Sequence, residues 1–500
     1  MKKNSGNVIA RRSVLRGTAV GTLALAATGD RALGRAKSTL PNIVFIMADD
    51  MGYADVACYG RPEVKTPAID HIAAKGVRLL QGYANSAVCS ATRTALITGR
   101  YQYRLPLGLE EPLFTDAHGI GLPPSHPTLP SILKAKGYGT TLLGKWHLGL
   151  MPEFGPLKSG YDHFYGFRNG ALDYYTHSPG GKETDFWNDD APVKDAGYLT
   201  ELLGNRAVDV VKGYAQSHQP FLISLHFNAP HWPWEAPGDE KEAERLRAEG
   251  KGLWHFDGGS QKTYLRMVEA MDTQIGRVLH ALEAAHLTSN TIVVFTSDNG
   301  GDRFSDTWPF TGKKTELLEG GLRVPAIISW PERLPQGKTS QQVAISMDWM
   351  PTFLAAAETA PDPAYPMDGM NLLPVLSGRS APVTRTLYWR YKANAQRAMR
   401  DGDFKYLKIN DNSFLFNVAD DPQERANLKT RRPEIFNALV AKWLRWNATM
   451  LPETDESKTG TPTAANWADH IGAQAPSGKA DNPVVANVPN GSSVPSASNR

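Results

Sequence analysis

A lone cysteine at the head of a predicted helix is the first feature of the chain that could do chemistry. Cys89 lies where a helix is predicted to begin in the stretch 88–100, and Gly99 is a typical helix stop. We expect Ser90 and Thr92 to cap the first turn. Because a helix N-terminus presents free N–H groups and a positive dipole end, the side chain at position 89 should face a site suited to anions. Alternatively, Cys89 is a small buried hydrophobic residue.

Four oxygen-bearing side chains follow two apolar runs, 42–48 and 291–296, that are far apart in the sequence. In open α/β sheets, sites form at the carboxyl ends of the strands, so these two ends can converge. An all-oxygen shell suits Ca²⁺, or Mg²⁺ if the cavity is tight, and argues against zinc. For the adjacent aspartates alone, a solvated turn is the simpler alternative. The four candidate metal ligands are Asp49, Asp50, Asp298 and Asn299.

Basic side chains follow two further apolar runs. Lys145 and His147 are two residues apart in a segment expected to be extended, so they should point the same way. His231 follows a proline in a predicted loop and is the better site candidate of the next pair. His226 lies inside an apolar strand, and we expect it in the core or behind the site.

These stretches resemble the hallmarks of type I sulfatases, a family of the alkaline phosphatase superfamily. The resemblance rests on the spacing Cys-x-x-x-Arg of Cys89 and Arg93, followed by Thr-Gly-Arg, and on the string Gly-Lys-Trp-His-Leu-Gly at 144–149. The segment 312–325 is also similar, and its register aligns the family lysine with Lys314 rather than Lys313. The resemblance spans about residues 41–428. Alanine and threonine stand where the commonest signature has proline and serine.

The resemblance implies that Cys89 is oxidised to formylglycine by a formylglycine-generating enzyme that reads the motif Cys-Ser-Ala-Thr-Arg. It also implies that the modified Cys89 joins the four oxygen ligands around a calcium ion, with Mg²⁺ as the alternative. One hydroxyl of the hydrated aldehyde would attack sulfur while Asp298 accepts its proton and Arg93 steadies the diol.

The same resemblance assigns the remaining steps of sulfate ester hydrolysis. Lys145, Lys314 and the metal would hold the sulfate oxygens. His231 would protonate the departing alcohol, and His147 would take the second hydroxyl's proton so that inorganic sulfate leaves. The implied substrate is an aryl or carbohydrate sulfate ester, either a small molecule or a glycan. Glu319 and Arg323, in the glycine-rich part of the same segment, are expected to fix a turn rather than touch substrate.

The apolar runs that precede these residues predict an α/β fold. They are continuous rather than alternating, which is typical of buried parallel strands. Helical periodicity over 264–284 indicates a crossover helix before the last of these strands. We therefore expect a large mixed, mostly parallel sheet flanked by helices. The predicted strands are 42–48, 139–143, 221–225 and 291–296.

A smaller C-terminal subdomain is predicted after this sheet. An Asp-Gly turn indicates a hairpin over 398–408, and an amphipathic helix follows at 433–446. This pattern predicts an antiparallel sheet plus a helix. The expected organisation is a signal peptide at 1–36, a sulfatase catalytic α/β domain at 40–380, the C-terminal subdomain at 385–450 and a disordered tail at 456–500.

The N-terminus resembles a twin-arginine export signal. Arg11 and Arg12 precede a modest apolar run to about Thr28, with no acidic residue before Asp30. That run is too short and too polar for a permanent membrane span. We therefore expect a periplasmic or secreted protein, and a disordered basic tail is the alternative.

The composition excludes some classes of partner. The 500-residue chain has 54 basic and 51 acidic side chains, a formal net charge of +3, which gives no support to nucleic-acid binding. Its 2 cysteines cannot form a disulfide framework. A Cys58–Cys89 bridge would block the site.

Two other functions stay open. A phosphomonoester or phosphonate-ester hydrolase of the same superfamily would use the same cradle for a tetrahedral oxyanion. An unmodified, non-catalytic binder of sulfated glycans would result if Ala91 abolished modification of Cys89. The aromatic segment 166–177, which includes Tyr174 and Tyr175, is either the rim of a substrate cleft or a packed loop.

Overall fold

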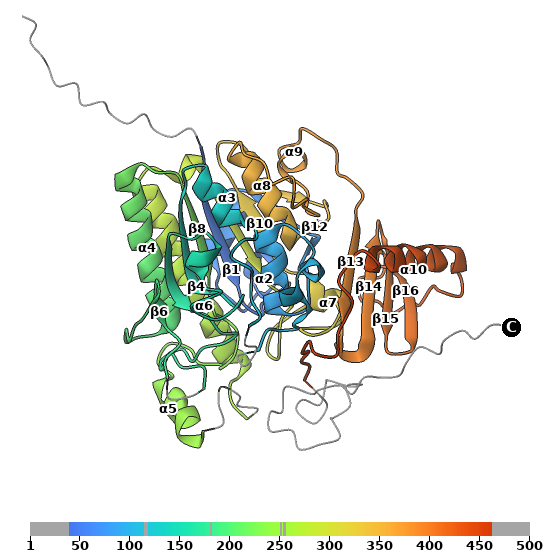
Figure 1. Cartoon of the computed structure of the whole chain (residues 1–500), viewed down its shortest axis with the longest axis horizontal. Coiled ribbons are helices and arrows are strands. Elements are labelled where there is room, and N and C mark those ends of the chain that lie inside the picture. Colours follow the sequence, from blue (N-terminus) through green and yellow to red (C-terminus); the bar gives the residue numbers. More distant parts are fainter. Residues whose placement is uncertain (1–39, 115–118, 181–182, 251–252, 254–256, 463–500) are drawn as a thin grey trace, which may run out of the picture. The chain divides into compact units, whose positions relative to one another are not determined.

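The computed structural model describes residues 40–114, 119–180, 183–250, 253 and 257–462, which belong to one compact unit. Within these ranges the largest feature is a 10-stranded sheet (Figure 1). Its strands are β1 Asn42–Ala48, β2 Val77–Leu79, β4 Gly139–Lys145, β5 His163–Phe167, β6 Trp187–Asn188, β7 Ala191–Pro192, β8 Phe221–His226, β9 Thr291–Ser297, β10 Ala326–Ser329 and β11 Lys338–Ser340. They lie in the order β11-β2-β10-β9-β1-β8-β4-β5-β6-β7. A separate parallel pair joins β3 Gly82–Tyr83 to β12 Ala344–Ile345.

The predicted α/β fold is confirmed. Strand β1 has the predicted bounds, and β4, β8 and β9 each begin where predicted and extend one or two residues further. β1 pairs in parallel with both β8 and β9, and β4 pairs in parallel with β8. The carboxyl ends of these four strands therefore meet at one edge of the sheet. β10 is antiparallel to β9, which makes the sheet mixed.

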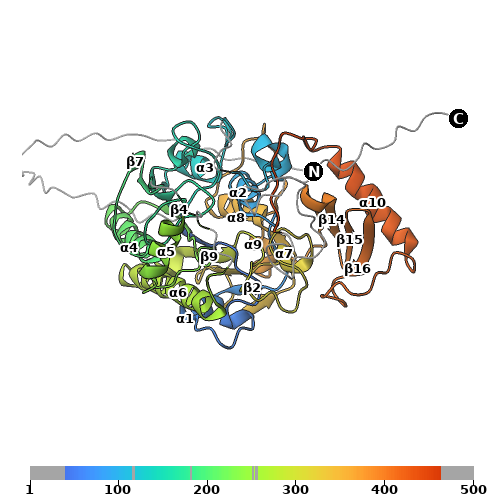
Figure 2. The same cartoon turned by 90° about the horizontal axis from the view of Figure 1, so that it is seen from below.

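Helices cover both faces of the sheet. Alternate residues of β1 point to opposite sides: Val44 and Ile46 pack in one core cluster, and Ile43 and Phe45 in another. Figure 2 shows α1, α4 and α6 on one side and α2, α3 and α8 on the other. The helices are α1 Pro67–Ala74, α2 Cys89–Thr98, α3 Leu129–Ala135, α4 Leu199–Ser217, α5 Glu240–Glu249, α6 Gln261–Ala284, α7 Glu319–Leu322, α8 Trp349–Ala356 and α9 Leu373–Leu376.

The C-terminal subdomain is an antiparallel sheet with one long helix, as predicted. The helix α10 (Pro433–Asn447) packs on the sheet through Leu439 and Trp443. Trp389 instead packs towards the catalytic part, where its Nε1 donates to the Ala84 carbonyl at 2.9 Å. A buried contact thus joins the subdomain to the segment that follows β3. Its strands, in spatial order, are β13 Thr386–Tyr391, β14 Gln396–Asp401, β15 Phe404–Ile409 and β16 Asn412–Asn417.

The predicted start of the disordered tail, residue 456, is wrong. Ser457, Thr459 and Thr461 are buried, and residues 457–462 run beside the loop at Glu111. The Glu111 N–H donates to the Lys458 carbonyl at 2.9 Å, and the Gly460 N–H donates to the Glu111 carbonyl at 2.8 Å. Backbone hydrogen bonds hold this segment, and the pattern of side chains does not encode them.

The other terminal predictions fall on residues that the structure does not describe. The predicted signal peptide at 1–36 and the remainder of the predicted tail, 463–500, lie outside the described residues. No helix within the described part of the chain combines the length and apolar character that a bilayer crossing requires.

Candidate active site

Cys89 is the first residue of α2, as the sequence predicts. Val88 is extended (φ −144°, ψ 154°) and Gly99 ends the helix in the left-handed region (φ 66°). The expected capping by Ser90 and Thr92 is wrong. Because both residues lie within the first turn, their hydroxyls face neighbouring loops: Ser90 Oγ accepts from the Leu113 N–H at 2.8 Å, and Thr92 Oγ1 donates to the Ser86 carbonyl at 3.1 Å.

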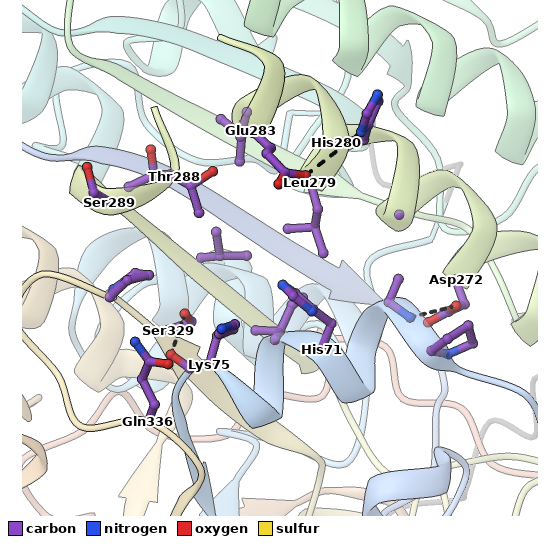
Figure 3. A pocket seen from close by; sticks show the side chains of 18 of the residues that line it. His71, Lys75, Asp272, Leu279, His280, Glu283, Thr288, Ser289, Ser329 and Gln336 are labelled. Atoms are coloured by element: carbon purple, nitrogen blue, oxygen red, sulfur yellow. Dashed lines mark hydrogen bonds and ion pairs between the residues drawn. The ribbon is translucent and has the colours of Figure 1, made fainter. Parts of the chain in front are cut away.

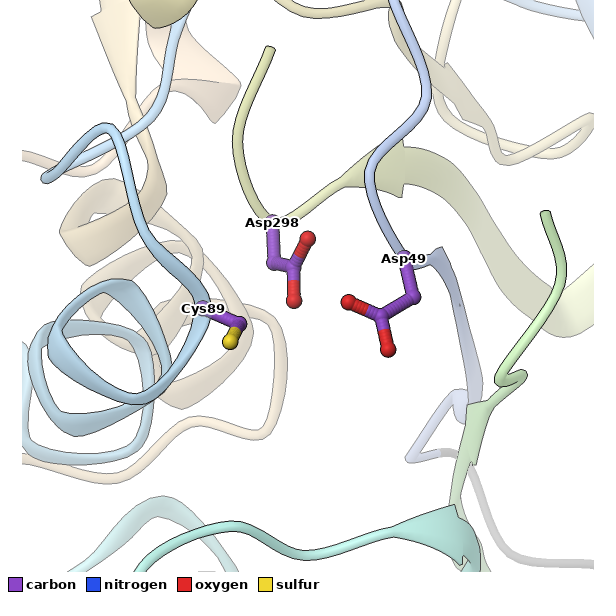
Figure 4. Close-up of side chains that lie close together, drawn as sticks. All are labelled: Asp49, Cys89 and Asp298. Atoms are coloured by element: carbon purple, nitrogen blue, oxygen red, sulfur yellow. The ribbon is translucent and has the colours of Figure 1, made fainter. Parts of the chain in front are cut away.

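The carboxyl ends of β1 and β9 bring two aspartates to the cysteine. One ligand atom from each of Asp49, Asp298 and Cys89 lies within 4.8 Å of the others, and all three residues are buried. Figure 4 shows the two carboxylates facing each other beside the thiol. Burial raises the pKa of the Cys89 thiol, although Lys145 and Lys314 oppose that rise. The unmodified thiol is therefore protonated at neutral pH and is a weak nucleophile.

Three cations, Arg93 and Lys145 buried and Lys314 nearly so, balance the carboxylates of Asp49, Asp50 and Asp298. Burial and the neighbouring Asp298 raise the pKa of Asp49 well above its ordinary value. Burial acts in the same direction on Asp298, but Arg93 and Lys145 outweigh it and lower the pKa of Asp298. The closest nitrogen–oxygen contacts are Arg93–Asp298 at 2.8 Å, Lys145–Asp49 at 2.6 Å and Lys314–Asp50 at 2.5 Å.

His231 lies directly at the lysine–aspartate pair. Its Nε2 is 3.2 Å from Lys314 Nζ and 3.3 Å from Asp50 Oδ2, while its Nδ1 is 2.6 Å from the Trp232 carbonyl. The carbonyl can only accept, so Nδ1 carries the proton and Nε2 accepts from Lys314. Burial, with Lys314 beside it, lowers the pKa of His231 well below its usual range.

His147 also lies in the buried cluster, but not in an extended segment as predicted. β4 ends at Lys145, and His147 has a left-handed backbone (φ 56°), which is a strained conformation for a non-glycine residue. The backbone bonds of this turn override the extended pattern, since the His147 N–H donates to the Arg168 carbonyl at 3.0 Å. Its Nε2 lies 2.8 Å from the Leu113 carbonyl, and its Nδ1 is buried without a hydrogen-bond partner. Burial lowers the pKa of His147 well below its usual range.

Other residues support the cluster from behind. His226 Nδ1 lies 3.4 Å from Arg93 Nη1, in agreement with the expectation that it sits behind the site. Tyr174 is fully buried and its hydroxyl donates to the His231 carbonyl at 2.9 Å, so it belongs to a packed loop. Asp302, which the sequence analysis missed, is buried beside Lys314 and Asp50; burial raises its pKa to about 6. The sequence feature that could have indicated Asp302 is its position just after Gly300-Gly301, which follow the predicted metal ligands.

The structure shows which of the two adjacent lysines belongs to the site. Lys314 Nζ lies in the cluster, whereas the Lys313 backbone N–H donates to Glu316 Oε2 at 3.0 Å. Glu319 and Arg323 fix the following turn as expected, with Arg323 Nε donating to Glu319 Oε2 at 2.7 Å.

The donor set fits a hard divalent cation. Asp49 Oδ1 and Asn299 Oδ1 are buried without hydrogen-bond partners, so both oxygens are available to a cation. Asp50 and Asp298 add buried carboxylates, linked by the Asp50 N–H donating to Asp298 Oδ1 at 3.2 Å. Oxygen ligands of this kind favour Ca²⁺ or Mg²⁺.

A cavity of about 840 Å³ lies between α1 and α6 (Figure 3). His71 from α1, Lys75 directly after it, and His280 and Glu283 from α6 line it. It reaches Thr291, the first residue of β9, and thus lies at the end of that strand opposite the cysteine cluster. It is separate from the candidate active site.

Comparisons with known proteins agree with this geometry. A family model described as sulfatase matches residues 41–359, and one described as N-sulphoglucosamine sulphohydrolase, C-terminal, matches residues 310–445. The N-acetylgalactosamine-6-sulfatase of Sus scrofa is 33% identical over 389 residues, covering 73% of this chain and 71% of the relative. Arylsulfatase J of Mus musculus is 29% identical over 478 residues, covering 84% and 78%.

Solved structures show the same likeness. The crystal structure of Ps i-CgsB superposes with a TM-score of 0.74 at 29% identity, covering 86% of this chain and 97% of that chain. The phosphonate monoester hydrolase of Agrobacterium radiobacter, at 20% identity and a TM-score of 0.58, shares the fold alone.

The fold is that of the alkaline phosphatase superfamily. Within it, the chain belongs to the type I sulfatase family, as the match over residues 41–359 shows. The protein is therefore a sulfatase, a sulfuric ester hydrolase.

Proposed function

We propose that this sulfatase releases inorganic sulfate from a sulfated carbohydrate or an aryl sulfate, using formylglycine formed from Cys89 and a bound Ca²⁺, or Mg²⁺. The observation that carries the proposal is the buried cluster of Cys89, Asp49 and Asp298 at the start of α2. A thiol is a poor ligand beside hard oxygen donors, and its raised pKa makes it a poor nucleophile. Oxidation of position 89 to an oxygen-bearing group removes both mismatches.

Asp49, Asp50, Asp298 and Asn299 would hold the cation together with the modified Cys89. When bound, the cation and the hydrated aldehyde would supply Lewis acidity and the nucleophilic oxygen.

The lysines and the helix N-terminus would bind the sulfate group. Lys145 and Lys314 converge on the aspartates that flank Cys89, and the free N–H groups of α2 add a positive field. These charges are fixed before substrate arrives, so they stabilise developing negative charge without reorganisation. Arg93, held against Asp298, would keep that carboxylate ionised as the acceptor of the nucleophile's proton.

The two histidines would carry the other protons. A bound anionic ester favours the charged form of a neighbouring imidazole. His231 would then hold a second proton at Nε2 and deliver it to the leaving alcohol. At His147, the Nε2–H donates to Leu113, so the buried Nδ1 is left as the base.

Carbohydrate sulfates are supported by the relatives. Ps i-CgsB has been crystallised in complex with k-i-k-neocarrahexaose, and another relative is an N-acetylgalactosamine-6-sulfatase. An aryl sulfate is the simpler substrate for an assay.

We also propose that a twin-arginine signal at 1–36 exports the protein to the periplasm or medium after a formylglycine-generating enzyme has modified it. Replacing Arg11 and Arg12 by Lys should retain the protein in the cytoplasm.

The test is to measure turnover and modification in the same calcium-loaded preparation. We expect hydrolysis of p-nitrophenyl sulfate to exceed that of p-nitrophenyl phosphate, and mass spectrometry of the tryptic peptide 79–93 to show aldehyde oxygen in place of sulfur. Faster phosphate release would favour the phosphomonoester or phosphonate-ester hydrolase. An unmodified thiol without turnover would favour the non-catalytic binder of sulfated glycans.

A further inference from the structure

The residue that follows Lys314 has a strained backbone. Thr315 has φ 71°, in the left-handed region that β-branched residues rarely adopt. Strain of this kind persists only where the surroundings over-determine the conformation. The segment between β9 and α7 therefore needs external support at the point where it carries the lysine.

Three different parts of the chain provide that support. The Thr315 N–H donates to the Ala87 carbonyl at 2.9 Å, two residues before Cys89. The Thr315 carbonyl accepts from Gln396 Nε2 at 2.9 Å, and the Thr315 hydroxyl lies 3.1 Å from the Thr461 hydroxyl. Every polar group of Thr315 is thus engaged, and two of its three partners lie after residue 385.

The Gln396 side chain forms hydrogen bonds with the backbone of the residues before and after Glu316. Its Oε1 accepts from the Leu317 N–H at 2.8 Å while its Nε2 donates to Thr315, and the side chain is 2% exposed. A side-chain amide can donate and accept at once, which a carboxylate or an aliphatic side chain cannot. Gln396, the first residue of β14, therefore acts as a hydrogen-bonding partner for the backbone next to Lys314.

We propose that Gln396 and Thr461 are positioning residues that act through Thr315 to place Lys314 beside Cys89, so that the C-terminal subdomain and the segment 457–462 are parts of the active site. The proposal rests on the proposed function, in which Lys314 binds the sulfate group. Lysine has a long flexible stem, so the place of its Nζ depends on the backbone that carries it. A misplacement of about 1 Å can lower a rate about 100-fold.

The first experiment compares kcat, KM and Tm of four variants with those of the wild type on p-nitrophenyl sulfate. Gln396→Leu removes the hydrogen bonds to Thr315 and Leu317, together with one to the Ala393 carbonyl, and should lower kcat/KM at least about tenfold; Gln396→Glu cannot donate to Thr315 and should do the same. Thr461→Val should lower it a few-fold. Gln423→Ala is the matched control, because Gln423 bonds the same segment through its carbonyl, which accepts from Thr311 Oγ1 at 2.8 Å. Its activity should be unchanged.

A double-mutant cycle separates positioning from general stability. If Gln396 acts through Lys314, Gln396→Leu should lower kcat/KM in the wild type but add nothing in a Lys314→Met background. An equal loss in both backgrounds would overturn the proposal, because it would show a role independent of Lys314. If Gln396→Leu does not fold, the same double-mutant cycle with Lys314→Met is made with Thr461→Val.

Binding of inorganic sulfate distinguishes failure of this proposal from failure of the proposed function. If the wild type hydrolyses no sulfate ester, the proposed function fails, and the same variants are compared by calorimetric Kd for sulfate. Weaker binding in Gln396→Leu, with no further loss in the Lys314→Met background, would support positioning. Unchanged binding, or no sulfate binding by the wild type, would refute it.

Discussion

Replacing the tandem lysines one at a time should affect activity at only one position. Lys314→Met keeps an unbranched side chain of similar length but removes the charge whose Nζ lies 2.5 Å from Asp50 and 3.2 Å from His231. Loss of one preorganised group of this kind costs about 2.7–4 kcal/mol in transition-state stabilisation, or about 10²–10³ in kcat. Lys313→Met should change kcat less than about threefold, because the Nζ against Asp50 and His231 belongs to Lys314 and not to Lys313.

Stability must be measured together with activity, because Lys314→Met also removes a positive charge that stabilises the buried Asp50 carboxylate. Breaking a buried pair by removing one partner costs about 3–5 kcal/mol. The loss here should be smaller, since Asn299 Nδ2 still donates to Asp50 Oδ1 at 2.8 Å. Calcium-loaded variants should therefore be assayed well below their Tm, with p-nitrophenyl sulfate as substrate and inorganic sulfate as inhibitor. A large loss in Lys313→Met with near-normal Lys314→Met would refute the assignment.

Three further predictions test the interior and the metal. Glu319→Gln should lower the free energy of unfolding in urea by about 1.5–3 kcal/mol, because Lys405 Nζ loses the charge of Glu319 at 2.9 Å but keeps Glu424 at 2.9 Å; a change below about 1 kcal/mol would contradict this. Burial raises the pKa of Asp272 to about 6, so the native state binds its proton more tightly than the unfolded chain. The stabilisation from this bound proton is complete below about pH 4 and is lost as pH rises to about 6. The free energy of unfolding of Asp272→Asn should therefore rise by up to about 3 kcal/mol relative to that of the wild type between pH 4 and 7. If the two curves of stability against pH are parallel, the prediction is wrong. A chelator should abolish turnover and lower Tm, with Ca²⁺ restoring both; full activity after chelation would exclude a required cation.

The fold was largely predictable because its signals are local. Continuous apolar runs marked β1 and β9, and the rule that parallel strands end at one edge predicts that Asp49 lies near Asp298, as it does. The Asp-Gly turn marked the hairpin of β14 and β15, whose Gly402 has φ 59°.

The parts that could not be predicted depend on contacts between distant segments. Tyr174 supports His231 through one hydroxyl, and nothing in the tyrosine-rich segment distinguishes that bond from ordinary packing. The ordering of residues 457–462 comes from backbone bonds to Glu111, which composition does not report. His147 departs from the extended pattern because its backbone is bonded to Arg168.

The complete enclosure of α2 restricts when position 89 could be modified under the proposed function. Every residue from Cys89 to Thr98 is buried, and Cys89 is 2% exposed. Under the proposed function, an enzyme that converts this cysteine must reach a side chain that the folded chain encloses. The proposed conversion would therefore precede closure of the sheet and helices over α2, and a chain that folded first would keep its thiol and lack the proposed nucleophile.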